Sequence, residues 1–320
     1  MKLTIKNFTN SLNKNFLFEN NPHVAVAVSG GPDSMCLVYL INEWNKTKKG
    51  KLIALLIDHK LREESSSECK QIKNYLMNLK INSKIFTISN TRLKKKTMAE
   101  ARHNRYGKLI NFCKKNNILH LFLGHHYDDN LETFLIRSVS GSNLEGLNSI
   151  SYISNLNKIN LIRPLLNNTK KQIVAFNKEK EIEYIIDPSN EHLKYTRVII
   201  RNFLNKTKQI KLIKKDFDRI KNLIPPYKMM INEILIKILI NIKKQKLSLS
   251  YGEFCKLDEE LKEKIVEKIY TYFFGKNRNL RYSKVRSFLH EIERKKVNFY
   301  NISGLKVIKD TEFLTFSINK

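Results

Sequence analysis

The segment that most constrains the fold runs from Val24 to Ser34. It reads Val-Ala-Val-Ala-Val-Ser-Gly-Gly-Pro-Asp-Ser, and a helical pattern begins at Asp33. The apolar run predicts a buried strand, and the glycines allow a tight turn. Because the first N–H groups of a helix have no partner within it, a strand that passes through glycines into a helix start forms an anion site. We therefore predict a phosphate-binding loop here, with an ordinary β–α turn as the structural alternative.

Apolar strands and helices alternate after this loop. After an amphipathic helix at 1–20, strands are predicted at 24–28, 52–57, 84–88 and 118–123, and helices at 65–79 and 98–116. This alternation is typical of an α/β fold with a doubly wound parallel sheet. In such sheets functional residues gather after the carboxyl ends of the strands.

A second polar segment follows the last of these strands. It reads Gly-His-His-Tyr-Asp-Asp-Asn-Leu-Glu-Thr over residues 124–133. Asp129 and Glu132 are three residues apart on the next predicted helix, so they share a face near its start, where two carboxylates suit a divalent cation. Helix capping by Asp128 is the structural alternative, but it does not explain the paired histidines. We expect His126, Asp129 and Glu132 to be functional.

The composition favours a polyanionic partner. The chain has 59 Lys and Arg against 30 Asp and Glu, a formal net charge of +29. Nucleic acid is the first expectation and an anionic membrane the second, although the abundance of Lys, Asn and Ile also fits a compositional bias. The four cysteines form no Cys-x-x-Cys pair, and no segment is apolar enough for a signal peptide or a membrane span. We therefore expect a cytoplasmic protein with no membrane partner.

Several ordered motifs between about residues 22 and 205 resemble tRNA(Ile)-lysidine synthetase, of the N-type ATP pyrophosphatase or PP-loop family. The glycine loop is similar to the family's phosphate loop, which lacks the lysine of the commoner NTPase P-loop. Other similar segments are Asp58–Glu63, Glu100–Tyr106, residues 124–133, Ser140–Leu147, Ile162–Leu165, Asp187–Asn190, Tyr195–Arg197 and Arg201. One departure is Val198, which follows Arg197 where the family commonly has asparagine. The length resembles the short form of the family.

The resemblance implies a reaction in two steps. ATP adenylates C2 of the wobble cytidine in the isoleucine tRNA with a CAU anticodon, and pyrophosphate leaves. The amine of free L-lysine then displaces AMP and leaves lysidine. The implied cofactors are ATP and Mg²⁺, and the implied partners are this tRNA and lysine. The oligomeric state stays open, with a homodimer as one option.

The site residues follow from the motifs and the resemblance together. The expected ATP-binding residues are Ser29, Gly30, Gly31, Pro32, Asp33 and Ser34. The expected catalytic residues are Asp33, Arg102, Arg105, His126, Asp129 and Glu132. Among them Asp33, Asp129 and Glu132 would hold Mg²⁺, and the residues expected to contact substrate or tRNA are His59, Arg62, Arg197 and Arg201. A solvated basic face is the alternative for the arginines at 102 and 105, and the group that deprotonates the lysine stays open among Asp129, Glu132 and Glu100.

The character of the chain changes near residue 206, where lysines crowd together. Pro225-Pro226 predicts a break, after which helices are predicted at 229–246, 258–274 and 283–294 and short antiparallel strands at 297–300, 305–308 and 313–316. We therefore predict a catalytic domain of residues 1–210 and a helix-rich α+β tRNA-binding domain of residues 211–320. A solvated face is the alternative for the lysines.

Two other functions are compatible with the sequence. One is another PP-loop enzyme that modifies tRNA, such as a thiolase, although the missing Cys-x-x-Cys pair disfavours sulfur transfer. The other is a non-catalytic basic RNA-binding protein with a vestigial ATP loop. The complete Ser29–Ser34 motif and the carboxylates Asp129 and Glu132 disfavour that reading.

Overall fold

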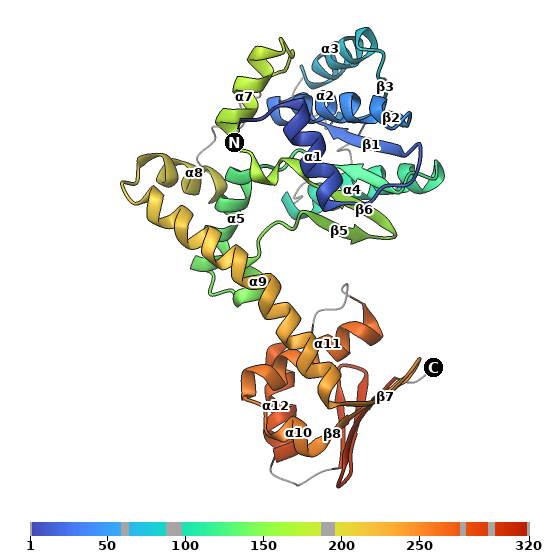
Figure 1. Cartoon of the computed structure of the whole chain (residues 1–320), viewed down its shortest axis with the longest axis vertical. Helices are drawn as coiled ribbons and strands as arrows, with labels where there is room; N and C mark the ends of the chain where they lie inside the picture. Colours follow the sequence, from blue (N-terminus) through green and yellow to red (C-terminus); the bar gives the residue numbers. More distant parts are fainter. Residues whose placement is uncertain are drawn as a thin grey trace. The chain divides into compact units, whose positions relative to one another are not determined.

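The computed structural model describes residues 2–58, 64–87, 98–186, 196–275, 280–293 and 298–318, without the side chains of 98–103 and 293. The chain forms two compact units, residues 1–220 and 221–320 (Figure 1). No helix in these described ranges is both long and apolar enough to cross a bilayer.

The first unit is built on a six-stranded sheet with the order β3-β2-β1-β4-β6-β5. Its strands are β1 (His23–Val28), β2 (Lys51–Asp58), β3 (Asn82–Thr87), β4 (His120–Phe122), β5 (Ile153–Leu156) and β6 (Ile159–Ile162). Neighbouring strands from β3 to β6 pair in parallel, and the edge strand β5 is antiparallel. The predicted α/β fold is confirmed. Because the strand order reverses between β1 and β4, their carboxyl ends form the switch point at which such sheets bind ligands.

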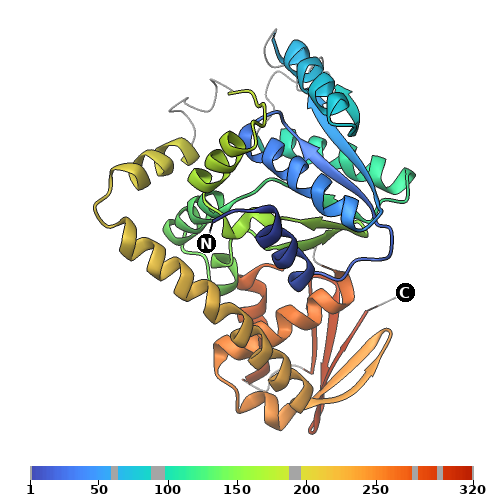
Figure 2. The ribbon, with the colours of Figure 1, turned by 45° about the horizontal axis from the view of Figure 1, so that its top comes forward.

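Helices cover both faces of this sheet because the strand residues alternate. On one face, β1 residues Val24 and Val26 belong to a core with α1 (Ile5–Asn15), α2 (Pro32–Thr47), α3 (Ser65–Asn78) and α7 (Lys170–Glu179). On the other face, Ala25 packs with residues of α4 (Met98–Lys115). Helices α1 and α2 lie side by side (Figure 2).

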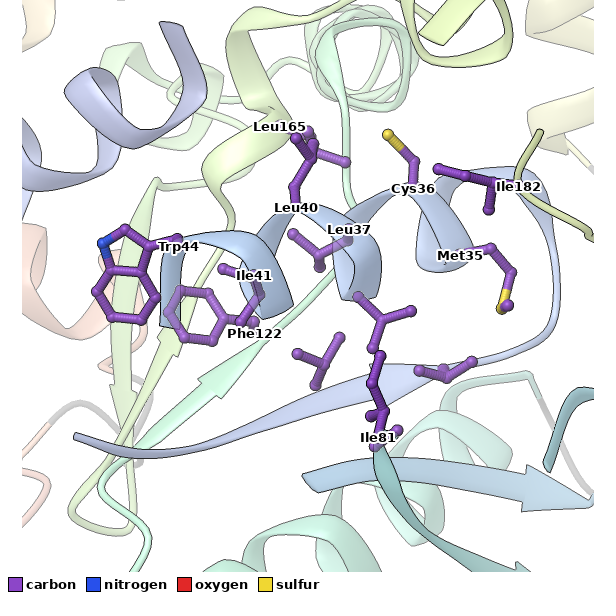
Figure 3. Packing of buried hydrophobic residues seen from close by; sticks show 14 of the residues in the cluster. Met35, Cys36, Leu37, Leu40, Ile41, Trp44, Ile81, Phe122, Leu165 and Ile182 are labelled. Carbon is purple, nitrogen blue, oxygen red and sulfur yellow. The ribbon is translucent and has the colours of Figure 1, made fainter. Parts of the chain in front are cut away.

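Helix α2 anchors the first core. Figure 3 shows Leu37, Ile41 and Trp44 of α2 on the same side of the sheet as Phe122 of β4, and all four are fully buried. The helix begins with Gly31 as its N-cap, Pro32 at its first position and Asp33 in its first turn, which is the favourable order for a helix start. The start of α2 is thus fixed at the carboxyl end of β1.

The remaining helices of the first unit come after β4 in the sequence. Its helices are α5 (Tyr127–Val139), α6 (Leu144–Leu147), the 3₁₀ turn η1 (Pro164–Asn167), α8 (Thr196–Lys206) and the beginning of α9 (Ile210–Ile238). Leu131 and Phe134 of α5 form a separate apolar cluster with Phe217 of α9. This cluster holds α5, whose first turn carries the second polar motif.

The second unit has its own core around an antiparallel sheet. The sheet has the order β7-β8-β11-β10-β9. Its strands are β7 (Leu239–Lys243), β8 (Lys246–Ser250), β9 (Phe299–Ile302), β10 (Leu305–Lys309) and β11 (Phe313–Ser317), and its helices are α10 (Tyr251–Cys255), α11 (Glu259–Phe274) and α12 (Tyr282–Glu293). Leu249, Ile265 and Phe316 are fully buried in this core.

Two predictions for this region are wrong. Pro225 and Pro226 do not break the chain but lie inside α9. Interior prolines cost a helix about 3 kcal/mol or more, and the burial of Ile224 and Ile231 on either side offsets that cost. The predicted helix at 229–246 ends at Ile238, and the following residues form β7, because pairing with β8 places them at the edge of the sheet.

Candidate functional site

The glycine loop between β1 and α2 has a fixed shape. Gly30 has φ of +85°, a conformation that favours glycine. The Ser34 hydroxyl accepts a hydrogen bond from the Ser29 N–H at 3.1 Å and donates to the Gly31 carbonyl at 3.0 Å. The Ile185 N–H donates to the Gly30 carbonyl at 2.9 Å. The predicted loop residues 29–34 therefore lie together at the switch point, where residues 29–31 precede α2 and residues 32–34 form its first turn.

The second polar motif begins in direct contact with this loop. A Cβ atom added to Gly124, just after β4, would lie 3.3 Å from backbone atoms of Asp33 and Ser34. Only a residue without a side chain allows this approach without a shift of the backbone. The sequence contains Gly124 at a strand end but gives no sign of the contact.

His126 joins three carboxylates at the start of α5. Its Nε2 lies 3.8 Å from Asp33 Oδ1 and 3.5 Å from Asp129 Oδ2, and its Nδ1 lies 3.5 Å from Asp128 Oδ2. Burial lowers the pKa of His126, but the polar contact with Asp128 and the charges of the three carboxylates outweigh it, so that the pKa is raised. The structure thus brings together Asp33, His126 and Asp129, as expected from the sequence.

Lys170 is a functional candidate that the sequence analysis missed. Its Nζ donates to both carboxylate oxygens of Asp33 at 2.7 Å, and its backbone N–H donates to Asp128 Oδ2 at 2.6 Å. The capping pair Thr169 and Gln172 could have predicted the start of α7, but not that Lys170 lies beside Asp33.

Glu132 faces an arginine in the structure. Its side chain is 2% exposed, and its two oxygens accept hydrogen bonds from Arg201 Nε at 2.8 Å and Nη2 at 3.3 Å. The hydrogen bond to Glu132 raises the pKa of Arg201. Arg197, one turn earlier on α8, donates to the Thr133 hydroxyl at 3.4 Å. Both arginines thus connect α8 to α5.

The carboxylates do not form a complete metal cage. Within the described part of the chain, no group of three or more acidic, histidine or cysteine side chains is arranged to hold a metal ion. Asp33 and Asp129, which both face His126 Nε2, are the pair that remains for an ion. Mg²⁺ in nucleotide sites is usually held by one or two carboxylates together with phosphates and water. The residues present therefore fit a Mg²⁺ ion that arrives with a nucleotide.

The other expected residues lie elsewhere or outside the described residues. Arg105 lies in α4, on the opposite face of the sheet from α2, with its guanidinium carbon 5.6 Å from the centroid of the Tyr106 ring. Arg102 also lies in α4, but its side chain is outside the described residues, as are His59 and Arg62 entirely. Asp58 is buried and accepts hydrogen bonds from the hydroxyls of Ser65 and Ser66 at 2.8 and 2.6 Å, so it holds the start of α3.

Comparison with known proteins identifies similar sequences. Residues 2–208 match the PP-loop domain family. A protein of Orientia tsutsugamushi named tRNA(Ile)-lysidine synthase is 39% identical over 198 residues, which are 62% of this chain and 45% of that protein. A protein of the same name from Rickettsia bellii is 31% identical over 301 residues, 89% of this chain and 67% of that protein. The chain spans about half the length of relatives such as the Orientia protein.

A solved structure shows the same fold. The U34-tRNA thiolase NcsA from Methanococcus maripaludis superposes with a TM-score of 0.56, at 19% identity, over 68% of this chain and 78% of that one. At 19% identity this likeness shows a shared fold and nothing further.

Proposed function

This chain belongs to the PP-loop family and, within it, to the tRNA(Ile)-lysidine synthases, and from that premise we propose that it converts a cytidine of an isoleucine tRNA to lysidine. The reaction would use ATP to adenylate C2 of the wobble cytidine and free lysine to displace AMP. The observation that carries the proposal is the meeting of Asp33, His126 and Lys170 beside the glycine loop.

The loop between β1 and α2 would hold the ATP phosphates. The N–H groups in the first turn of α2, which no side chain caps, would donate to an anion, and the conformation of Gly30 would let the backbone approach it. Asp33 and Asp129 would hold Mg²⁺, which would offset the charge that develops on the phosphates. This assignment omits Glu132, because its side chain is 2% exposed and Arg201 engages both of its oxygens, whereas the Asp33 side chain is 27% exposed.

His126 would act as a hydrogen-bond donor in this site. Its carboxylate neighbours raise its pKa, which favours the protonated imidazolium over what burial alone would give. A protonated His126 suits a phosphate oxygen better than it suits the deprotonation of lysine. The same carboxylates, above all Asp129, would attract the cationic amine of the incoming lysine.

The tRNA would approach over α8 and the start of α9. Three exposed lysines follow Arg201 in the chain: Lys206 at the end of α8, Lys208 in the turn after it and Lys211 in the first turn of α9. Phosphates of the RNA backbone are attracted to such a surface. We also propose that the second unit, predicted as the tRNA-binding domain, contributes to tRNA affinity.

One assay tests this function directly. The protein is incubated with ATP, Mg²⁺, radiolabelled lysine and a panel of tRNAs. We expect label to enter the isoleucine tRNA with a CAU anticodon, and AMP to form only when that tRNA is present. Label in other tRNAs would contradict the proposed specificity, and no label in any tRNA would contradict lysidine formation.

A further inference from the structure

The ion pair between Lys170 and Asp33 lies where a ligand can reach it. The side chains of Lys170 and Asp33 are 41% and 27% exposed, and Lys170 Nζ is 2.7 Å from both Asp33 oxygens. The hydrogen bond from the Lys170 N–H to Asp128 fixes the start of α7 beside α5. The backbone contact with Asp128 therefore positions the Lys170 ammonium group at the edge of the glycine loop. The carboxylate that it pairs with, Asp33, belongs to that loop.

The ion pair is not needed to attach α7 to α2. Ile173 and Phe176 of α7 are buried in the core that includes α2, and Asn177 Nδ2 donates to the Pro32 carbonyl at 2.9 Å. These contacts would remain if the Lys170 side chain were shortened. Attachment of α7 to α2 therefore does not require the Lys170 ammonium group.

The charges around the glycine loop suggest a role for Lys170 in binding an anionic ligand. The loop itself supplies backbone N–H groups and hydroxyls but no cationic side chain, and Asp33, Asp128 and Asp129 are anionic. A triphosphate that enters such a site meets carboxylates that repel it unless cations lie nearby. Lys170 and His126 both face Asp33, and Lys170 brings the cationic group.

We infer that Lys170 is a phosphate-binding residue that exchanges partners when ATP binds. In the free protein it pairs with Asp33. When ATP enters, its ammonium group moves to the β and γ phosphates, and the Asp33 carboxylate becomes available to the magnesium ion that accompanies the nucleotide. This inference rests on the proposed use of ATP.

Binding measurements on the full chain test the phosphate contact. Isothermal titration calorimetry with Mg²⁺ would compare AMP with the ATP analogue that has a methylene bridge between its α and β phosphates. Lys170→Met should weaken binding of the analogue about 10-fold or more, the size expected for a charge-assisted hydrogen bond, and change AMP binding less than about twofold. Lys171→Met, at the exposed neighbouring position, is the matched control and should change neither.

The outcomes separate this inference from the proposed function. If the unaltered protein binds the analogue and Lys170→Met binds it equally well, or loses AMP to the same degree, Lys170 does not bind the β and γ phosphates. If the unaltered protein binds no nucleotide, the proposed use of ATP is itself wrong, and this inference fails with it. Unfolding curves in urea would show that Lys170→Met is folded.

The exchange of partners has its own test in buffer without Mg²⁺. If Asp33 competes with phosphate for Lys170, Asp33→Asn should tighten binding of the analogue about fivefold or more. The same substitution in the Lys170→Met background should tighten it much less. Equal gains in both backgrounds would mean that Asp33 merely repels the nucleotide, and partner exchange would be refuted.

Discussion

Arg201→Ala is expected to destabilise the first unit because it leaves Glu132 without its cation. The Glu132 side chain is 2% exposed, so its carboxylate depends on the two hydrogen bonds from Arg201. Removing one partner of a fully buried ion pair costs about 3–5 kcal/mol. The Arg201 side chain is 44% exposed, so water can enter where the guanidinium stood. That lowers the expected cost to about 1.5–3 kcal/mol, the range of hydrogen bonds to a charged group.

Two variants control this measurement. Arg197→Ala removes one hydrogen bond of 3.4 Å to Thr133 on the same pair of helices, so it should cost less than about 1 kcal/mol. Adding Glu132→Gln to Arg201→Ala removes the stranded charge and should recover part of the lost stability.

The single tryptophan makes the assay specific to one unit. Trp44 is fully buried in the core of the first unit, so its fluorescence during urea unfolding reports that unit and not the second. The reasoning is refuted if Arg201→Ala is as mild as Arg197→Ala, or if the double variant is as unstable as Arg201→Ala. A higher Mg²⁺ requirement in Glu132→Gln alone would return Glu132 to the metal site.

Four further predictions can be checked separately. Gly30→Ala should lower the free energy of unfolding by about 1–2 kcal/mol in the same urea assay, because φ of Gly30 is positive. Gly107→Ala, in the middle of α4 where an added methyl group meets nothing within 4 Å, should raise it by about 0.5–1 kcal/mol. Equal effects of the two substitutions would contradict the strain at Gly30. Asp33→Ala should abolish ATP-dependent AMP formation and leave tRNA affinity nearly intact, and the reverse pattern would remove Asp33 from the site. The affinity for tRNA should fall about 100-fold or more between about 50 and 200 mM salt, and a flat response would mean that the basic charge does not bind RNA. Burial, with Asp58 and Glu68 nearby, raises the pKa of Cys69 to about 11, so only about 0.1% of this thiol is thiolate at pH 8. Iodoacetamide should therefore label Cys69 slowly until the protein unfolds, and rapid labelling of Cys69 in the native protein at pH 8 would contradict this.

The parts of the site that are local in sequence could be predicted from it. The strand, the glycine turn and the start of α2 follow from residues 24–34 alone, because each depends on its neighbours in the chain. His126 and Asp129 follow from their place just after a parallel strand. Contacts between distant residues could not be predicted in this way. Lys170 is 137 residues from Asp33, and Arg201 is 69 residues from Glu132, so no local pattern pairs them.

The errors in the last third have a similar cause. Local rules predict a break at Pro225-Pro226, but buried apolar residues on both sides of the pair keep α9 helical. Around Ile240 and Ile242 the apolar spacing fits either a helix or a strand, and pairing of β7 with β8 decides for the strand. In both places tertiary packing overrides the local preference.

The close approach of Gly124 to the backbone of Asp33 has a consequence for reading genetic variation at this position. A mutational scan scored by activity would mark residue 124 as intolerant, although the side chain of glycine is a single hydrogen atom and brings no reactive group. Loss of activity in such variants would result from displacement of the backbone at Asp33 and Ser34, because the main chain at residue 124 lies so close to it.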